Sequence, residues 1–223
     1  MTPLGAGVLL LWGTLVGLDL VSVGQVMISR PLVAASVAGA ILGDPVGGVT
    51  VGLVLELFAL EVLPVGASRY PDYGPASVAA AAVAAGPDPL RNLGIAVTAG
   101  LIVAYGSEFT ILELRRRNSR AVQRHLEQLS TGDPALIRAF HRAGLARDAL
   151  RSLALTAGGL GVALLARHWP PLTPRSAALL DVAAIGAGIS AALSGALRAA
   201  GTNVGMRWFA IGIAAGIGVV ALL

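Results

Sequence analysis

Polar side chains recur at the end of the first long apolar stretch, in a pattern that could bind a small polar solute. Asp19, Ser22, Gln25 and Ser29 are separated by three, three and four residues, which would place them on one stripe of a helix. The segment Leu4–Ile28 that contains most of them is apolar and long enough to span a membrane. We interpret the stripe as facing a pocket. The alternative is a terminal turn that dips into the water among lipid headgroups.

A carboxylate also lies within the next apolar stretch. Gly48, Gly52 and Glu56 are separated by four and four residues, so two small residues and one carboxylate share a helix face. Small residues allow another backbone to approach closely, and the carboxylate would then point into the gap. An ionisable group at membrane depth indicates a functional site. The alternative for Glu56 is a hydrogen bond that only joins two helices.

Proline and aspartate divide this region into pieces that are too short to cross a bilayer. Pro31–Leu42 has 12 residues and would cover only ~18 Å of a hydrocarbon core of ~30 Å. Asp44 followed by proline is typical of a helix N-cap. Pro75–Ala85 is again short, and Asp72 lies in the loop before it. Discontinuous helices of this kind form transporter sites, so we expect a solute site here.

The composition of the whole chain indicates a membrane protein. Of its 223 residues, 56% are hydrophobic and 13% are charged, and the mean hydropathy is +0.79. One soluble core cannot bury so much apolar surface. We therefore expect a single all-α, polytopic domain over residues 1–223, with full transmembrane helices and broken or re-entrant half-helices.

The residue types exclude several chemistries. The chain has no cysteine and no lysine, which rules out thiolate metal sites, cysteine nucleophiles and the phosphate-binding loop of a transport ATPase. The three histidines are far apart in the sequence, and hydrolase and dinucleotide motifs are absent. We expect no catalytic residue, metal or cofactor. The energy for transport would then come from a partner protein or from an ion gradient. If the gradient is one of protons, Asp19, Glu56 and Asp72 could relay them.

Later segments supply further membrane spans and a basic region between them. The predicted spans are Asn92–Leu114, Ser152–Ala166, Ser176–Leu197 and Val204–Leu223. Nine arginines lie from Arg115 to Arg151, beside membrane spans, which indicates the cytoplasmic side of a membrane and not nucleic-acid binding. A helix is predicted to begin at Asp133-Pro134. We expect this basic amphipathic loop to lie on the membrane surface, with contact to a partner as the alternative.

Several short motifs, taken together, resemble a known family. They are Arg30–Val33 (RPLV), Gly39–Asp44 (GAILGD), Gly52–Leu60 (GLVLELFAL), Val65–Ala67 (VGA) and Pro71–Asp72 (PD). In this order and spacing they are similar to the IIC permease subunit of the mannose/fructose/sorbose family of the bacterial phosphoenolpyruvate-dependent sugar phosphotransferase system. The resemblance is clearest over residues 17–82 and is only hydropathic in the last third of the chain.

The resemblance implies a multi-pass subunit of the bacterial inner membrane that pairs with a homologous IID membrane subunit and translocates a hexose. Cytoplasmic IIA and IIB proteins would phosphorylate the sugar, so the chain would not be an enzyme by itself, and IIC–IID pairs would associate further. It also implies a sugar site at Gln25, Glu56 and Asp72, and the polar stripe adds Asp19 to these candidates. The carboxylates would accept hydrogen bonds from sugar hydroxyls, and Gln25 would donate and accept.

The order of the predicted segments divides the chain into three parts. We expect residues 15–114 to form the substrate core with re-entrant arms, residues 115–151 the cytoplasmic Arg-rich loop, and residues 152–223 the C-terminal spans. The loop Ser68–Pro75 carries larger side chains than the family prefers. Two other interpretations stay open: a divergent membrane scaffold that recruits phosphotransfer proteins without transport, and a gradient-driven transporter of a small solute.

Overall fold

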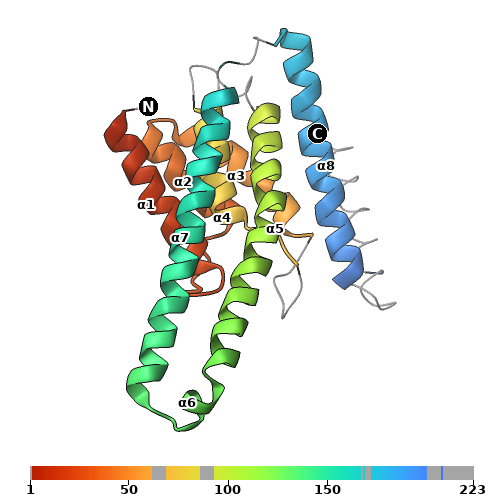
Figure 1. The fold of residues 1–223 in the computed structure, drawn as a ribbon. Coiled ribbons are helices and arrows are strands. Elements are labelled where there is room, and N and C mark those ends of the chain that lie inside the picture. Colours follow the sequence, from red (N-terminus) through yellow and green to blue (C-terminus); the bar gives the residue numbers. More distant parts are fainter. Residues whose placement is uncertain are drawn as a thin grey trace.

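The chain folds into a bundle of α-helices (Figure 1). The computed structural model describes residues 2–61, 69–85, 93–166, 168, 172–199 and 207. Within these ranges the helices are α1 (Pro3–Asp19), α2 (Pro31–Leu42), α3 (Pro45–Ala59), α4 (Tyr73–Ala84), α5 (Leu93–Arg124), α6 (Leu126–Ser130), α7 (Pro134–Ala166) and α8 (Pro174–Ala199). Helices α5, α7 and α8 are long and apolar enough to cross a membrane. The expected all-α polytopic fold is confirmed. Except for Arg207, the predicted span Val204–Leu223 lies outside the described residues, as does the Val65–Ala67 motif.

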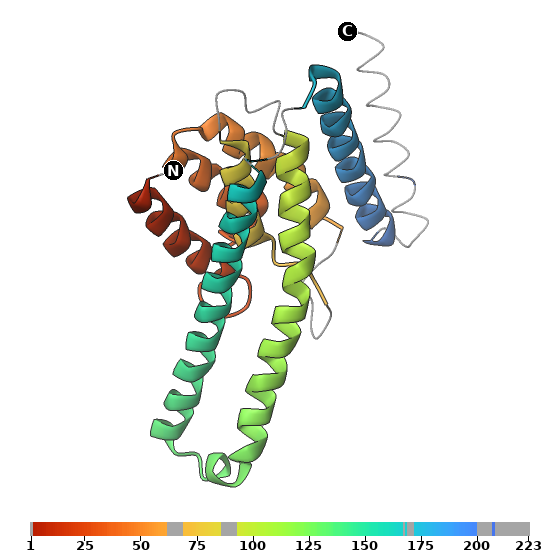
Figure 2. The same cartoon turned by 45° about the horizontal axis from the view of Figure 1, so that its top comes forward.

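Helices α5 and α7 are longer than a bilayer requires. With 32 and 33 residues, each extends for about 50 Å, against ~30 Å for a hydrocarbon core. Their distal halves leave the bundle together as a hairpin that is closed by α6 (Figures 1 and 2). The helix start at Pro134 is as predicted. Residues 115–151 are helical and not an extended loop, and most of them project from the bundle, while Asp148 and Arg151 at the foot are buried in it. The apolar stretch of α5 ends where polar residues begin, but the helix continues, because Ala, Arg, Leu and Glu all favour helices.

Helix α1 ends earlier than the sequence suggests. The Asp19 carboxylate accepts hydrogen bonds from the backbone N–H groups of Val26 (2.8 Å) and Ser29 (3.0 Å), which offers the backbone an alternative to the helical ladder. Three residues here have left-handed backbone conformations: Gly24, Gln25 and Met27. The predicted single span Leu4–Ile28, and with it the helical polar stripe, is therefore wrong. Residues 20–30 form a loop, called the α1–α2 loop below.

Helix α2 is the short helix that the sequence predicts, and α3 follows it after a tight turn. Helix α2 ends at Gly43, whose φ is +79°. Asp44 caps α3 by accepting a hydrogen bond from the N–H of Gly47 at 2.9 Å, as its position before proline predicts. The two helices then pack backbone to backbone, because a Cβ at Gly48 would lie 2.5 Å from the carbonyl oxygen of Ala35. This close approach is the role that the sequence assigned to the small residues of α3.

Helix α4 is the centre of the bundle. All of its residues are buried, and it packs against α1, α2, α3, α5 and α7. Its alanine-rich sequence has no polar face, which is typical of a helix surrounded by protein. Asp72 precedes it and accepts a hydrogen bond from the N–H of Gly74 at 3.3 Å. Helix α8 lies at the edge of the bundle against α3 and α5 (Figure 2).

The glycine contact between α2 and α3 gives a test of this fold. We expect Gly48→Ala to lower the free energy of unfolding by about 1–3 kcal/mol, because the added methyl group would press on backbone atoms that cannot move aside. Thermal unfolding of the purified protein in detergent would show a lower Tm. Gly106→Ala is the matched control, since nothing lies within 4 Å of its Cβ position and alanine favours the helix. Equal Tm values for the two variants would contradict the close contact.

Candidate functional site

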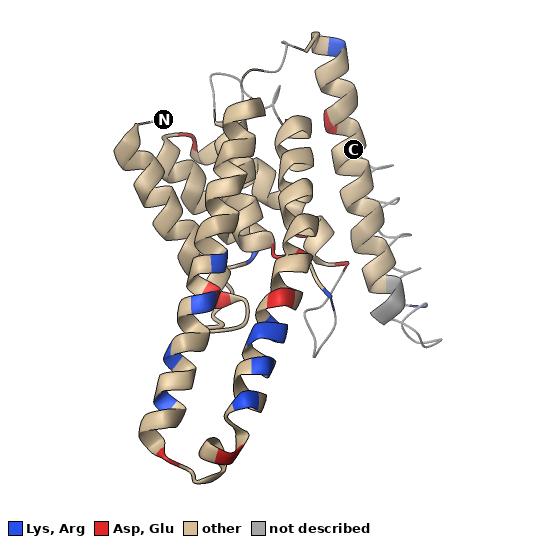
Figure 3. Cartoon of the chain, in the orientation of Figure 1, with Lys and Arg blue, Asp and Glu red and all other residues tan. Residues whose placement is uncertain are grey.

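Charged side chains gather where the α5–α7 hairpin leaves the bundle. Figure 3 shows basic residues along both helices of the hairpin and acidic residues at its junction with the bundle, while few charges occupy the opposite end. Three polar features lie near this junction: a buried ion network, a half-buried ion pair and a cavity.

The buried network is centred on Arg151 of α7. Its Nε donates to Asp148 Oδ1 and its Nη2 donates to Asp72 Oδ2, both at 2.8 Å. The side chains of Asp72 and Asp148 are 0% and 1% exposed, and that of Arg151 is 6% exposed. Charges this deeply buried are stable only when each is paired and hydrogen-bonded. Arg151 therefore supplies the charge that both aspartates require.

Hydroxyl groups extend this network to other segments. Ser107 Oγ on α5 accepts a hydrogen bond from the backbone N–H of Asp72 at 2.7 Å, and Ser22 in the α1–α2 loop donates to the second carboxylate oxygen of Asp148. With the Gly74 bond described above, each carboxylate oxygen of both aspartates has a protein partner. The network joins the α1–α2 loop, the start of α4, α5 and α7 at one point.

The half-buried pair joins the start of α2 to α3. Arg30 donates from Nε to Glu56 Oε1 at 2.6 Å, and its Nη2 reaches the same oxygen. The other oxygen of Glu56 accepts a hydrogen bond from the N–H of Leu32 at 3.1 Å, which satisfies a donor in the first turn of α2. The two side chains are 32% and 20% exposed. This geometry corresponds to the alternative considered for Glu56, a bond that joins two helices.

The cavity lies between the α1–α2 loop, the start of α2, the end of α3 and the segment that leads into α4. Its volume of ≈ 390 Å³ is within the usual range for small-molecule sites. Its walls combine aromatic rings, neutral polar groups and charged groups that already have partners. The polar and aromatic lining residues are Asp19, Gln25, Ser29, Arg30, Tyr70 and Tyr73.

The structure brings only part of the predicted sugar site together. Asp19 and Gln25 line the cavity, although both oxygens of Asp19 are used within the α1–α2 loop. Glu56 and Asp72 do not line it, but the partner of Glu56, Arg30, does, as do both chain neighbours of Asp72. Gln25 is exposed, and its side chain makes no hydrogen bond to another described residue. It is thus the predicted residue best placed to bind a ligand.

Sequence reasoning missed the basic partners of the carboxylates. Arg151 was grouped with the arginines of a polar loop, although Asp148 lies three residues before it and an apolar span begins directly after it. An oppositely charged pair at this spacing, at the edge of a span, is a signal that could have been used. Nothing in the sequence links Arg30 to Glu56, because the pairing depends on how α2 folds back onto α3.

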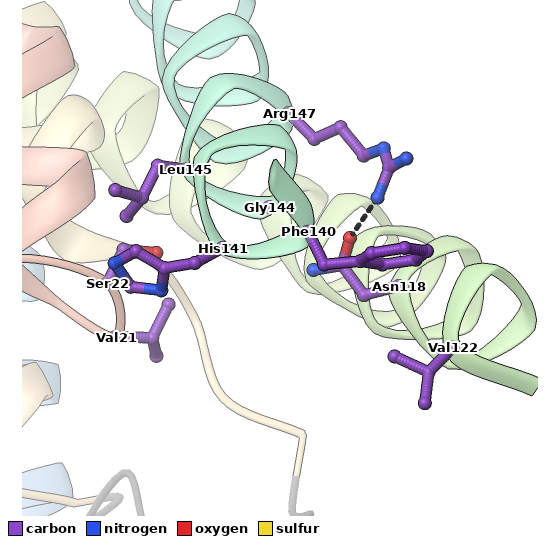
Figure 4. A pocket seen from close by; sticks show the side chains of 9 residues that line it. All are labelled: Val21, Ser22, Asn118, Val122, Phe140, His141, Gly144, Leu145 and Arg147. Atoms are coloured by element: carbon purple, nitrogen blue, oxygen red, sulfur yellow. Dashed lines mark hydrogen bonds between the residues drawn. The ribbon is translucent and has the colours of Figure 1, made fainter. Parts of the chain in front are cut away.

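A second pocket of ≈ 360 Å³ lies at the base of the hairpin. In Figure 4, Ser22 and His141 lie on one side of it and Asn118 on the other, where Arg147 donates to the Asn118 amide oxygen at 3.0 Å. The remaining lining is largely apolar, with Phe140 among its members. Among the described residues, no group of three or more His, Cys, Asp or Glu could hold a metal ion.

The helical bundle, its three candidate spans and its broken half-helices define a multi-pass membrane protein. The family model described as "PTS system sorbose-specific iic component" matches residues 4–157, where PTS denotes the phosphotransferase system. The match covers the half-helices, the ion network and the cavity. The chain belongs to this family.

Individual relatives agree with this assignment. A sorbose-specific EIIC component of Lacticaseibacillus casei is 36% identical over 103 residues, 46% of this chain and 36% of that protein. One of Klebsiella pneumoniae is 39% identical over 82 residues, 37% of this chain and 30% of that protein. The fructose permease IIC component of Bacillus subtilis is 40% identical over 82 residues, also 37% of this chain and 30% of that protein. The chain thus spans about a third of the length of these relatives.

Two solved structures share the fold over the whole chain. A protein described only as a membrane protein aligns with a TM-score of 0.74 at 18% identity. The mannose transporter ManYZ, in a cryo-electron-microscopy complex with microcin E492, aligns with a TM-score of 0.63 at 19% identity. Each alignment covers 100% of this chain and 93% of the other.

Removing the guanidinium from the buried network should destabilise the bundle. We expect Arg151→Gln to lower the free energy of unfolding by about 3–5 kcal/mol, because two buried carboxylates would lose the cation that pairs with both of them. Thermal unfolding in detergent would measure the loss. Arg142→Gln, at an exposed position on the same helix, is the control and should melt like the wild type.

A triple variant separates lost charge pairing from poor packing of the new side chain. Adding Asp72→Asn and Asp148→Asn to Arg151→Gln removes the unpaired charges, so part of the lost stability should return. If Arg151→Gln alone melted at the temperature of the Arg142→Gln control, the network would not have the stabilising role assigned to it.

Proposed function

We propose that this chain is the sugar-translocating IIC subunit of a mannose/fructose/sorbose-type phosphotransferase system. In this proposal it binds a hexose and carries it across the bacterial inner membrane, and partner proteins phosphorylate the sugar. Phosphoryl transfer would then be done by those partners and not by this chain. Membership of the IIC family supports the proposal, as does the naming of the relatives as sorbose-specific components and a fructose permease.

The cavity beside the hairpin is the observation that carries this proposal. A hexose is uncharged and presents hydroxyl groups that both donate and accept hydrogen bonds. The amide of Gln25 can do the same, and tyrosine rings offer apolar faces with polar tips. The charged groups of this wall already have partners. A neutral polyhydroxylated ligand can therefore bind without removing water from an unpaired ion of the protein.

We assign the four predicted site residues different parts in sugar binding. Gln25 would contact the sugar directly. Asp19 would shape the α1–α2 loop that carries Gln25, since it holds the backbone of Val26 and Ser29. Glu56 and Asp72 would hold two walls in place through their arginine partners, and they would not themselves bind sugar hydroxyls.

The proposed subunit acts within a larger assembly. A homologous IID membrane subunit would complete the translocation unit, IIC–IID pairs would associate further, and cytoplasmic IIA and IIB proteins would approach the hairpin. Residues 15–114 would provide the sugar-binding core, 115–151 the cytoplasmic hairpin and 152–223 the C-terminal spans. The arginines of the hairpin support a cytoplasmic location for it, because basic residues near membrane spans are retained on that side.

A second candidate function is a membrane scaffold that recruits phosphotransfer proteins without moving sugar. Its support is the pairing of both Glu56 and Asp72 with arginines, as expected if the carboxylates had only structural parts. The cavity argues against it, since a scaffold needs no space for a hexose. Sugar uptake distinguishes the two candidates.

Uptake of labelled hexoses tests the permease directly. In cells that also make the presumed IID partner and the IIA and IIB proteins, we expect phosphoenolpyruvate-dependent accumulation of sugar phosphate. Gln25→Ala should raise the KM for uptake by about 2- to 10-fold, the effect of losing a hydrogen bond worth about 0.5–1.5 kcal/mol. Gln123→Ala, exposed on the hairpin, is the control with wild-type uptake. A correctly inserted complex that transports no hexose would favour the scaffold.

The side of the membrane on which the hairpin lies can be determined by single-cysteine labelling. The chain has no cysteine, so Ser119→Cys on the exposed surface of α5 introduces the only thiol. We expect a membrane-impermeant maleimide to label it in inside-out vesicles and not in intact spheroplasts. His168→Cys, exposed after the opposite end of α7, should show the reverse. Labelling of Ser119→Cys in intact spheroplasts would refute the proposed orientation.

A further inference from the structure

An arginine of the hairpin holds one wall of the cavity. Arg115 Nη2 donates a hydrogen bond to the hydroxyl of Tyr70 at 2.9 Å, and its Cζ lies 5.1 Å from the centroid of the same ring. Tyr70 lines the cavity and is only 3% exposed. A guanidinium that both bonds the hydroxyl and lies over the ring restricts how the ring can turn.

Arg115 differs in this contact from the two arginines that follow it. Arg116 is exposed, and Arg117 pairs at 2.9 Å with Glu113 one turn away, where the two side chains are 66% and 42% exposed. An exposed pair of this kind contributes little to stability. Retention on the cytoplasmic side accounts for arginines in general, but not for the packing of Arg115 against a cavity wall.

We propose that Tyr70 contacts the sugar and contributes to selectivity, and that Arg115 is its positioning residue. The inference rests on the proposed function, because it takes the cavity to be the hexose site. A tyrosine hydroxyl that accepts a hydrogen bond from Arg115 keeps its own hydrogen to donate. Among the described residues none is seen to accept that hydrogen, and a ligand that reaches the hydroxyl could accept it.

The second tyrosine of the cavity narrows the ligand class. Tyr73 lines the same cavity, so two aromatic rings are available to one ligand. The negative face of an aromatic ring attracts weakly positive C–H groups, which a pyranose ring presents on its faces, while its hydroxyls project from the rim. The Tyr70 hydroxyl and the Gln25 amide can bond those hydroxyls. The site is therefore assigned to a hexose in its pyranose form.

Transport kinetics of Arg115→Lys test the positioning role. Lysine keeps the positive charge but lacks the planar guanidinium that bonds the hydroxyl and lies over the ring. We expect an increase in KM of about 2- to 10-fold, the effect of one lost hydrogen bond, with Vmax and membrane level unchanged. The ratio of the KM values of two hexoses should also change. Arg116→Lys is the matched control and should keep the wild-type KM and ratio.

A double variant shows whether Arg115 acts through Tyr70. Tyr70→Phe keeps the ring and removes the hydroxyl, so it should also raise KM. If the arginine works only by holding that hydroxyl, adding Arg115→Lys to Tyr70→Phe should have little further effect, a non-additive result for residues in contact. Additive effects in the double variant, or wild-type selectivity in Arg115→Lys, would overturn the inference.

Failure of this inference and failure of the proposed function give different results. If the wild-type complex transports a hexose, and Arg115→Lys and Tyr70→Phe transport it with wild-type KM and selectivity, the inference alone is wrong. Thermal stabilisation by added hexose reports binding independently of transport. If the wild-type complex neither transports nor is stabilised by any hexose, the proposed function is refuted, and the inference with it.

Discussion

The burial of Arg151 between two carboxylates is the constraint on which the rest of the bundle depends. A guanidinium at 6% exposure is tolerated only with fixed anionic partners, because the free energy of removing it from water has to be offset by pairing. Its partners are Asp72, directly before α4, and Asp148 of α7 itself. Ser22 of the α1–α2 loop joins the network by donating to Asp148. The network therefore fixes two segments that line the cavity relative to the long helices. These are the α1–α2 loop and the segment that precedes α4.

Broken helices create the space that these ionic contacts enclose. Helix α1 ends at Asp19, α3 ends at Ala59 and α4 begins at Tyr73, all near the foot of the hairpin. Because none of these three helices continues past this level, loops meet there and leave a cavity. Of the described helices that meet at this level, α5 and α7 alone continue, as the basic hairpin. The cavity and the surface that would meet cytoplasmic partners are therefore neighbours.

The geometry separates the paired carboxylates from the neutral polar and aromatic groups that line the cavity. A buried carboxylate in a sugar permease invites assignment to the sugar, yet Asp72 and Glu56 have their oxygens occupied by arginines and backbone donors. Gln25, Tyr70 and Tyr73 offer neutral polar and aromatic surface instead. This arrangement suits an uncharged ligand. Buried charges make the structure rigid when all of them are paired, and the ligand is left to contact neutral groups.

The sequence by itself determined the membrane class, the family, the bounds of α2, the cap at Asp44 and the helix start at Pro134. These features follow from composition, from ordered motifs and from capping preferences that act over a few residues. Only the tertiary structure decided that α1 stops at Asp19 and which partners the charges take. Arg30 and Glu56 are 26 residues apart, and Asp72 and Arg151 are 79 apart. An ion pair at such a separation exists only after the chain has folded, because hydropathy and spacing carry no information on which opposite charge will be near.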